Sequence, residues 1–281
     1  MEFLADLAEY TFLQRSFITS IWVGVISGLI GSFIIMRGMA LMGDAISHAI
    51  LPGIAISYML GVNYFYGAVL FGVLATIGIG AISQHSRIKH DSSIGIVFTA
   101  FFALGVILVS KTPTATDLTQ ILFGNVLSVR PSDMWLTIGL GVVIILVVLL
   151  FYKELLISTF DETMAQVYGL KTKLIHYVIM ILLTMATVAS LQTVGVVLVV
   201  AMLITPAATA YLLTNHFSIM LLLAAFFGAI SSVIGLYFSV TYNLPSGAII
   251  VLVATVLFLI AFFFSPKQGI FWRLFRSKQI S

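Results

Sequence analysis

Residues 38–53 read GMALMGDAISHAILPG, and the rest of the chain is best understood from this stretch. It lies in an apolar run, residues 17–83, whose only readily charged side chains are Arg37, Asp44 and His48. Asp44 and His48 are four residues apart, so on a helix they share one face, one turn apart. An aspartate at the centre of a helix in lipid costs about 2.5–3.5 kcal/mol. The pair is therefore expected to bind a cation or to relay a proton.

The composition predicts a membrane protein. Of the 281 residues, 61% are hydrophobic and 8% are charged, whereas about 25% of the residues of a soluble domain are charged. The apolar segments do not alternate with polar residues as barrel strands do, so an all-α, polytopic helical fold is expected, with one transmembrane domain over residues 1–281. Cysteine is absent, which excludes disulfides and thiolate ligands. The net charge of +3 gives no indication of a nucleic-acid partner.

About nine segments are long enough, or nearly so, to cross the hydrocarbon core. Eight or ten crossings are the alternatives, because the second segment is short and the sixth and seventh are separated only by Gln192 and Thr193. On the first segment, glycines at three- and four-residue spacing (Gly24, Gly28 and Gly31) predict a helix-packing face. The nine segments are placed near residues 17–36, 44–60, 64–83, 93–110, 134–152, 174–191, 194–213, 218–240 and 246–264.

The distribution of lysine and arginine predicts the orientation. With nine crossings, the positive charges of Arg37, of residues 85–91, of residues 153–173 and of the C-terminal tail all lie on one side. That side is expected to be cytoplasmic, which puts the N-terminus outside and the C-terminus inside. Arg37 itself is expected to anchor the first span at the lipid headgroups.

Two connections are expected to be more than linkers. The outer loop, residues 111–133, contains the amphipathic stretch DLTQILFGNVLSV. The cytoplasmic segment, residues 153–173, contains a predicted short helix at 161–168 with acids in its first turn and a stop at Gly169. This helix is interpreted as a docking element for a partner; the alternative is an ordinary amphipathic surface helix.

The Asp44–His48 pair has two interpretations. Asp44 could cap a helix that begins at Ala45, with His48 donating to a backbone carbonyl. Alternatively, carboxylate oxygen and neutral imidazole nitrogen suit manganese, zinc or iron(II). Two ligands are too few for a complete site, so other helices or a second copy on a two-fold axis must contribute. Pro52 cannot donate an N–H, so it opens the helix and frees the His48 carbonyl as an additional oxygen ligand.

A second polar group, Thr205, Pro206 and Thr209, interrupts a later apolar span. It is interpreted either as a packing kink or as a flexible gate. The remaining histidines are weaker ligand candidates, because two lie in a basic loop and two at span ends: His85, His90, His176 and His216. The sequence has no phosphate-binding GxxxxGK[ST] motif and no HExxH or GxSxG, so the chain is not expected to be an enzyme.

RGMALMGDAISHAILPG resembles the signature of the metal-type ABC importer permeases, which serve manganese, zinc and ferrous iron. The likeness continues in SSIGIVFTAFFALGVIL (92–108), DLTQILFGNVLSV (117–129), FDETMAQVYGL (160–170) and QTVGVVLVVAMLITPAATAYLL (192–213). It covers most of the chain and is nearest to the manganese permeases of Gram-positive bacteria. The resemblance implies a type II ABC importer-like fold in a bacterial plasma membrane.

The resemblance also implies partners and roles. The family works as a homodimer of permeases with two cytoplasmic ATP-binding subunits, which hydrolyse the ATP, and an extracellular metal-binding lipoprotein. Asp44 and His48 match the intramembrane metal pair, with Mn(II) as transported ion and no permanent cofactor. The residues that match the helix seated on the ATPase are Phe160, Asp161, Glu162, Ala165 and Gly169. The alternatives are a zinc or iron(II) importer of the same build, or a proton-coupled secondary transporter.

Overall fold

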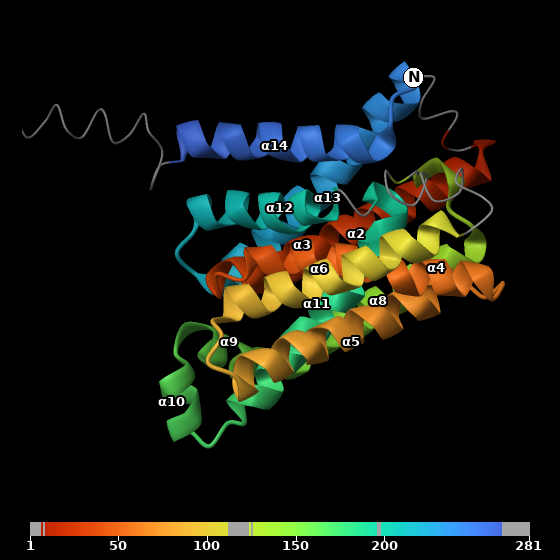
Figure 1. Cartoon of the computed structure of the whole chain (residues 1–281). Helices are drawn as coiled ribbons and strands as arrows, with labels where there is room; N and C mark the ends of the chain where they lie inside the picture. Colours follow the sequence, from red (N-terminus) through yellow and green to blue (C-terminus); the bar gives the residue numbers. More distant parts are fainter. Residues whose placement is uncertain (1–6, 8, 112–123, 125, 196–197, 266–281) are drawn as a thin grey trace, which may run out of the picture.

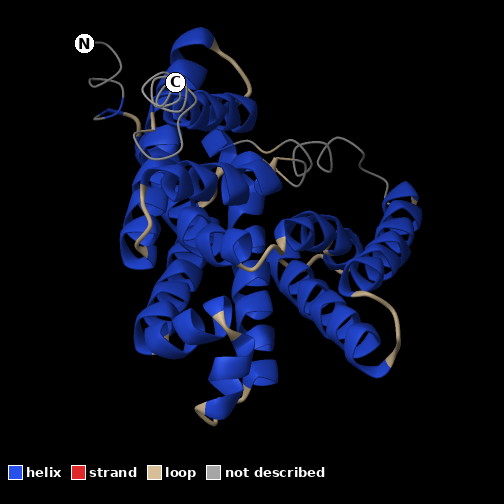
Figure 2. Ribbon diagram, turned by 90° about the vertical axis from the view of Figure 1, so that its left-hand side faces the viewer, coloured by secondary structure: helices blue, strands red, loops and turns tan. Residues whose placement is uncertain are grey.

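The computed structural model describes residues 7, 9–111, 124, 126–195 and 198–265, and the regular structure of this part of the chain is entirely helical (Figures 1 and 2). The predicted all-α class is confirmed. In chain order the helices are α2 (Thr11–Met36), α3 (Ala40–Ala49), α4 (Leu51–Met59), α5 (Tyr64–His85), α6 (His90–Ser110), η1 (Val126–Ser128), α8 (Pro131–Leu150), α9 (Tyr152–Phe160), α10 (Glu162–Val167), α11 (Thr172–Val194), α12 (Val199–Leu213), α13 (Phe217–Tyr242) and α14 (Ser246–Phe264).

Eight of the described spans are long and apolar enough to cross a membrane, if α3 and α4 are taken together as Ala40–Met59. The seventh predicted segment corresponds to α12, which is apolar but shorter. The sequence marks the boundary between the sixth and seventh segments only weakly. In the structure it falls at Gly195, which is the C-cap of α11 and has a backbone φ of 79°. Each of the nine predicted segments thus has a helical counterpart among the described residues.

Helix α2 packs tightly against α13 and α12, as the spacing of its glycines predicts. At Gly24 and Gly28 an added methyl group would collide with the backbone of Gly228 and Ala224 on α13. At Gly31 it would collide with the backbone of α12. The absence of side chains lets these helices approach through their backbones, which favours close van der Waals packing in a membrane.

The corner between α2 and α3 is a Schellman motif. The Gly38 N–H bonds to the Ile35 carbonyl and the Met39 N–H to the Ile34 carbonyl, at 3.1 and 3.0 Å. Gly38 has a φ of 67°, a conformation that glycine adopts without strain. The chain can therefore stop α2 and begin α3 only a few residues later.

The headgroup anchor predicted for Arg37 is wrong. Its half-buried guanidinium donates from Nη2 to Ser158 Oγ at 2.8 Å and from Nε to Thr159 Oγ1 at 3.2 Å. Both hydroxyls belong to the end of α9, so the arginine joins two parts of the protein instead of reaching into lipid. Sequence spacing alone could not indicate a partner more than 120 residues away.

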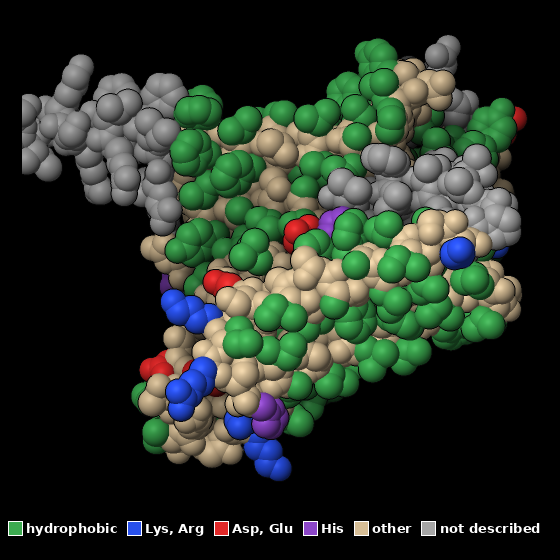
Figure 3. Space-filling view, in the orientation of Figure 1, with side chains coloured by type: hydrophobic (Ala, Val, Ile, Leu, Met, Phe, Trp, Pro, Cys, Tyr) green, Lys and Arg blue, Asp and Glu red, His purple; other side chains and the backbone are tan. Residues whose placement is uncertain are grey.

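Helices α9 and α10 lie at one end of the bundle, where most of the Lys and Arg side chains visible in Figure 3 gather. Most of the predicted outer loop, residues 112–123 and 125, lies outside the described residues. The part that follows is held in place, because Ser16 donates to the Val126 carbonyl at 2.9 Å and the Val126 N–H bonds to Ser246 Oγ at 3.2 Å.

Candidate metal site

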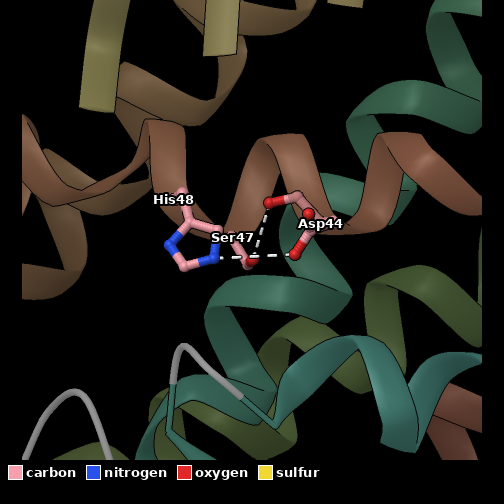
Figure 4. A network of polar contacts seen from close by, with 3 residues as sticks. All are labelled: Asp44, Ser47 and His48. Carbon is pink, nitrogen blue, oxygen red and sulfur yellow. Dashed lines mark hydrogen bonds and ion pairs between the residues drawn. The ribbon is translucent and has the colours of Figure 1, made fainter. Parts of the chain in front are cut away.

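Asp44 and His48 lie one turn apart on α3, with Asp44 Oδ1 3.5 Å from His48 Nε2 (Figure 4). Between them, the Ser47 hydroxyl donates to the backbone carbonyl of Asp44 at 2.8 Å. This bond occupies the Ser47 side chain with the helix backbone and leaves the carboxylate to face the imidazole. The four-residue spacing thus produces the pairing on one helix face that the sequence predicts.

The helix-capping interpretation of Asp44 is wrong. Helix α3 begins at Ala40 and not at Ala45, so Asp44 lies inside the helix and not at its N-cap. Its side chain remains 52% exposed on the protein surface. An exposed carboxylate on an apolar span needs another explanation than helix capping, and ligation of a cation supplies one.

The alternative in which His48 donates to a backbone carbonyl is also wrong. Its ring is 22% exposed and lies edge to face with Phe98 and Phe102 of α6, at centroid distances of 5.6 and 5.4 Å. Within the described part of the chain, buried Nδ1 has no hydrogen-bond partner. Histidine ligands usually donate their second N–H to an acceptor, which raises their basicity. Here two aromatic rings orient the imidazole instead, and Nε2 is the nitrogen that faces Asp44.

The pair lies between the end and the middle of its span. With a rise of 1.5 Å per residue, Asp44 is about 6 Å and His48 about 12 Å from Ala40, along a 20-residue span of about 30 Å. Figure 3 shows acidic and histidine side chains side by side on a face of the molecule that is otherwise rich in hydrophobic side chains. The two side chains therefore face outward along an apolar span and are not sealed inside the chain.

A single chain supplies too few ligands. Among the residues that the structure describes, no group of three or more His, Cys, Asp or Glu side chains could hold a metal ion. Zinc usually takes four ligands, and the exposed position of Asp44 leaves room for others to approach. The geometry fits half of a site that a second protein surface would complete.

Pro52 breaks the span as predicted. Helix α3 ends at Ala49, α4 begins at Leu51, and the proline lies in the first turn of α4. The break is mild, because Ile50 between the two helices keeps right-handed helical angles. Use of the His48 carbonyl as an additional metal ligand stays a prediction.

Thr205, Pro206 and Thr209 lie within one uninterrupted helix, α12. Pro206 and Thr209 are buried, and the Thr209 hydroxyl donates to the Thr205 carbonyl at 2.7 Å. This is the ordinary bond of a threonine hydroxyl to the carbonyl four residues before it, whereas the carbonyl that Pro206 leaves without an amide donor is that of Met202. A gating role for these residues stays a prediction.

The other histidines have neighbours of their own, away from the metal pair. His85 Nδ1 lies 3.0 Å from the Ala81 carbonyl and is exposed. The rings of His90 and His176 face each other at 5.7 Å. His216 precedes α13 as its N-cap. None of these contacts supplies the carboxylate that would complete a metal site.

The predicted short helix is present as α10. Asp161 caps it, because its Oδ1 accepts from the Met164 N–H at 2.9 Å. The helix ends before Gly169, which has a φ of 75° and whose N–H bonds to the Gln166 carbonyl at 2.9 Å. The start and the stop therefore lie where the acids and the glycine predict them.

Of the five residues predicted for docking, Phe160, Asp161, Glu162 and Gly169 are exposed, whereas Ala165 is fully buried. Ala165 therefore packs α10 against the rest of the chain and offers no surface to a partner. Besides Phe160, this segment exposes three apolar side chains that the sequence interpretation missed, namely Met164, Val167 and Tyr168, with Val167 79% and Tyr168 67% exposed. Their spacing of three and four residues is a signal that could have identified them.

Phe98 and Phe102 are the second set that the sequence interpretation missed. They stack on each other at 5.8 Å and hold the His48 ring from a different helix. Their four-residue spacing predicts a shared face of α6, but no sequence pattern indicates that this face meets α3. Only the packing of the two helices identifies them as neighbours of the site.

Comparison with known proteins identifies relatives along nearly the whole chain. The model of the ABC 3 transport family matches residues 9–265. The chain is 63% identical to the manganese transport system membrane protein MntC of Listeria monocytogenes over 270 residues, 96% of each chain. It is 51% identical to the manganese import system permease protein ScaB of Streptococcus parasanguinis, over 95% of each chain.

A solved structure supports the same assignment. The structure described as PsaBC from Streptococcus pneumoniae in complex with Fab superposes with a TM-score of 0.89, at 48% identity and over 99% of each chain. The match to the family model includes the stretch that carries Asp44 and His48. The chain belongs to the ABC 3 transport family.

Proposed function

We propose that this chain is the membrane-spanning permease subunit of an ATP-driven importer of Mn(II) in a bacterial plasma membrane. The observation that carries the proposal is the Asp44–His48 pair, 3.5 Å apart on an apolar span and partly exposed. Carboxylate oxygen and imidazole nitrogen suit manganese. The relatives named for manganese transport, with identities of 51% and 63%, support this ion over zinc or iron(II).

The functional unit in this proposal is a dimer of permeases. Each chain contributes two ligands, and a two-fold axis beside α3 would bring four together. The exposed Asp44 carboxylate supports this arrangement, because a partner can reach it. A site assembled from two surfaces can also open when the surfaces separate, so it can release the ion to either side.

ATP hydrolysis in this proposal belongs to separate cytoplasmic subunits that dock on α10. The exposed apolar side chains of Met164, Val167 and Tyr168 support this role, since they lie at the positively charged end of the bundle. An extracellular metal-binding lipoprotein would deliver the ion at the opposite end, over residues 111–133. The N-terminus is then outside and the C-terminus cytoplasmic.

The His48 environment favours transient binding. In the tautomer that donates from Nε2 to Asp44, the Nε2 position is occupied by a proton, and a metal ion must displace it. The proton would then have to lie on Nδ1, where the described surroundings offer no acceptor. Metal binding therefore loses one favourable contact without gaining a hydrogen bond, which keeps the affinity low enough for release.

Reconstituted transport tests the proposal. Proteoliposomes containing the permease, the ATPase subunits and the binding protein should accumulate Mn(II) only when ATP is supplied. A proton gradient without ATP should drive no uptake, which separates this mechanism from a proton-coupled transporter. Competition by Zn(II) and Fe(II) at equal concentration separates the manganese importer from its alternatives. Uptake that follows the proton gradient and ignores ATP would contradict the proposal.

A further inference from the structure

Arg37 connects the segment proposed to dock the ATPase with the corner that precedes the metal-ligand helix. Its guanidinium donates at 2.8 Å to Ser158 and at 3.2 Å to Thr159, which both lie in the last turn of α9. Ser158 is buried, and the Thr159 hydroxyl also donates to the Leu155 carbonyl at 2.6 Å. The acceptors are thus held firmly on α9.

The other end of the link is the corner between α2 and α3. Arg37 is the C-cap of α2, and the Schellman bonds of Gly38 and Met39 follow it directly. Helix α3 begins at Ala40, and Asp44 lies one turn further on. A displacement of the Arg37 side chain therefore acts at the corner from which α3 starts.

Gly38 gives this corner room to change. It has a φ of 67°, and an added Cβ would meet no atom within 4 Å. The Cβ position of Gly38 therefore faces open space, and the corner turns through a backbone conformation in which glycine is unstrained. Few-residue corners of this kind absorb the backbone changes that accompany domain motion.

Charge reinforces the connection to α10. Burial lowers the pKa of Arg37 from its usual range, and the carboxylate of Glu162 opposes that shift. Glu162 lies in the first turn of α10. The arginine is therefore attracted to α10 as well as bonded to α9.

We propose that Arg37 is the positioning residue that transmits movement of α9 and α10 to α3, and so opens or closes the Asp44–His48 site. This inference rests on the proposed function. A movement of α10 driven by the ATPase would carry Ser158 and Thr159 with it, and the two hydrogen bonds would pull the α2–α3 corner in the same direction.

A second connection from α9 provides a matched control. The Tyr152 hydroxyl lies 2.7 Å from Ser218 Oγ, at the start of α13, and the Phe160 ring meets Phe217 at 5.7 Å. These contacts reach α13, which packs against α2, α12 and α14. The Tyr152 bond ties α9 to the start of α13, whereas the Phe217 ring also lies edge to face with Phe33 in the last turn of α2, at 5.0 Å. The Tyr152 bond alone is therefore the control.

The test measures Mn(II) uptake and ATP hydrolysis together in proteoliposomes of the whole transporter. Arg37→Gln removes the charged donor, and the double variant Ser158→Ala, Thr159→Val removes both acceptors while keeping the arginine. Tyr152→Phe removes the bond to α13 and serves as the control. Equilibrium Mn(II) binding without ATP is measured for each variant, to separate transmission from ligation.

We expect ATP hydrolysis to continue in the Arg37 and Ser158/Thr159 variants while the ions imported per ATP fall, on the order of tenfold for the loss of a charge-assisted hydrogen bond. Tyr152→Phe should keep the parent ratio, and Mn(II) binding without ATP should be unchanged in all of them. If the Arg37→Gln transporter does not assemble, the number of Mn(II) ions imported per ATP by the Ser158/Thr159 variant tests the role of Arg37.

The transmission role would be overturned if Ser158→Ala, Thr159→Val kept the parent number of Mn(II) ions imported per ATP. It would also be overturned if Tyr152→Phe lowered that number as much as the double variant does. A proportional fall of uptake and hydrolysis would also overturn it, because it would indicate a purely structural contribution. A parent transporter that imports no Mn(II) with ATP would overturn the proposed function itself, and with it this inference.

Discussion

Asp44 Oδ1 and His48 Nε2 face each other at 3.5 Å across one turn of α3. Two neighbouring ligands at about 2.1 Å from a metal ion lie about 3.4 Å apart in the tetrahedral geometry of zinc and about 3.0 Å apart in the octahedral geometry that manganese usually takes. The pair can therefore receive an ion with little movement of either side chain.

Removing either ligand should abolish transport without unfolding the protein. Asp44→Ala and His48→Ala should each reduce ATP-driven Mn(II) uptake to background, because two of the four proposed ligands disappear from the dimer. Asp44 is 52% exposed, so its loss should leave thermal stability unchanged. Asp91→Asn, an exposed acid in the first turn of α6, is the matched control and should transport normally. Parent-rate uptake by the double alanine variant would refute the assignment.

The aromatic pair beside His48 should affect metal affinity. Phe98→Ala and Phe102→Ala remove edge-to-face contacts worth about 0.5–1.5 kcal/mol each, so the imidazole should lose its fixed orientation. Equilibrium Mn(II) binding should weaken by about two- to tenfold. Phe101→Ala, where the ring meets Phe71 instead, is the control. Equal weakening by the control would mean that α6 packing in general, and not the contact with His48, sets the affinity.

Glycine contacts should control the stability of the helix core. Gly24→Ala places a methyl group against the backbone of Gly228, so α2 and α13 must separate. Overpacking of this kind costs about 1–3 kcal/mol, and the thermal midpoint of the purified protein should fall. Gly139→Ala on α8 meets no atom within 4 Å and should not lower the midpoint. Equal midpoints for the two variants would show that the close approach of α2 and α13 is not needed for stability.

The exposed side chains of α10 should hold the ATPase. Val167→Ala together with Tyr168→Ala removes two outward apolar side chains, and co-purification of the ATPase subunits should drop severalfold. Thr163→Ala, exposed on the same helix, should retain the partner. Undiminished co-purification of the double variant would place the docking surface elsewhere.

Much of the fold could be predicted from the sequence, because apolar length determines which segments can cross a bilayer. The nine segments, the glycine face of α2 and the short helix stopped by Gly169 all follow from local patterns. The pairing of Asp44 with His48 also follows, since both belong to one helix.

Contacts between distant helices could not be predicted in the same way. Arg37 contacts α9 and His48 contacts α6 only because of how the helices pack. A single sequence does not indicate which residues of two distant helices lie side by side. The inward direction of Ala165 escaped prediction for a related reason, since the family motif identifies a segment but not which side of it faces the protein.

The proposed mechanism depends above all on two copies of the chain sharing one manganese site. Equilibrium binding of Mn(II) to the purified permease dimer in lipid, followed by the electron paramagnetic resonance of the free ion, measures this stoichiometry. We predict one Mn(II) for two chains, lost when Asp44 and His48 are both replaced by alanine. One ion per chain, or unchanged binding in the double variant, would show that the site is not shared in this way.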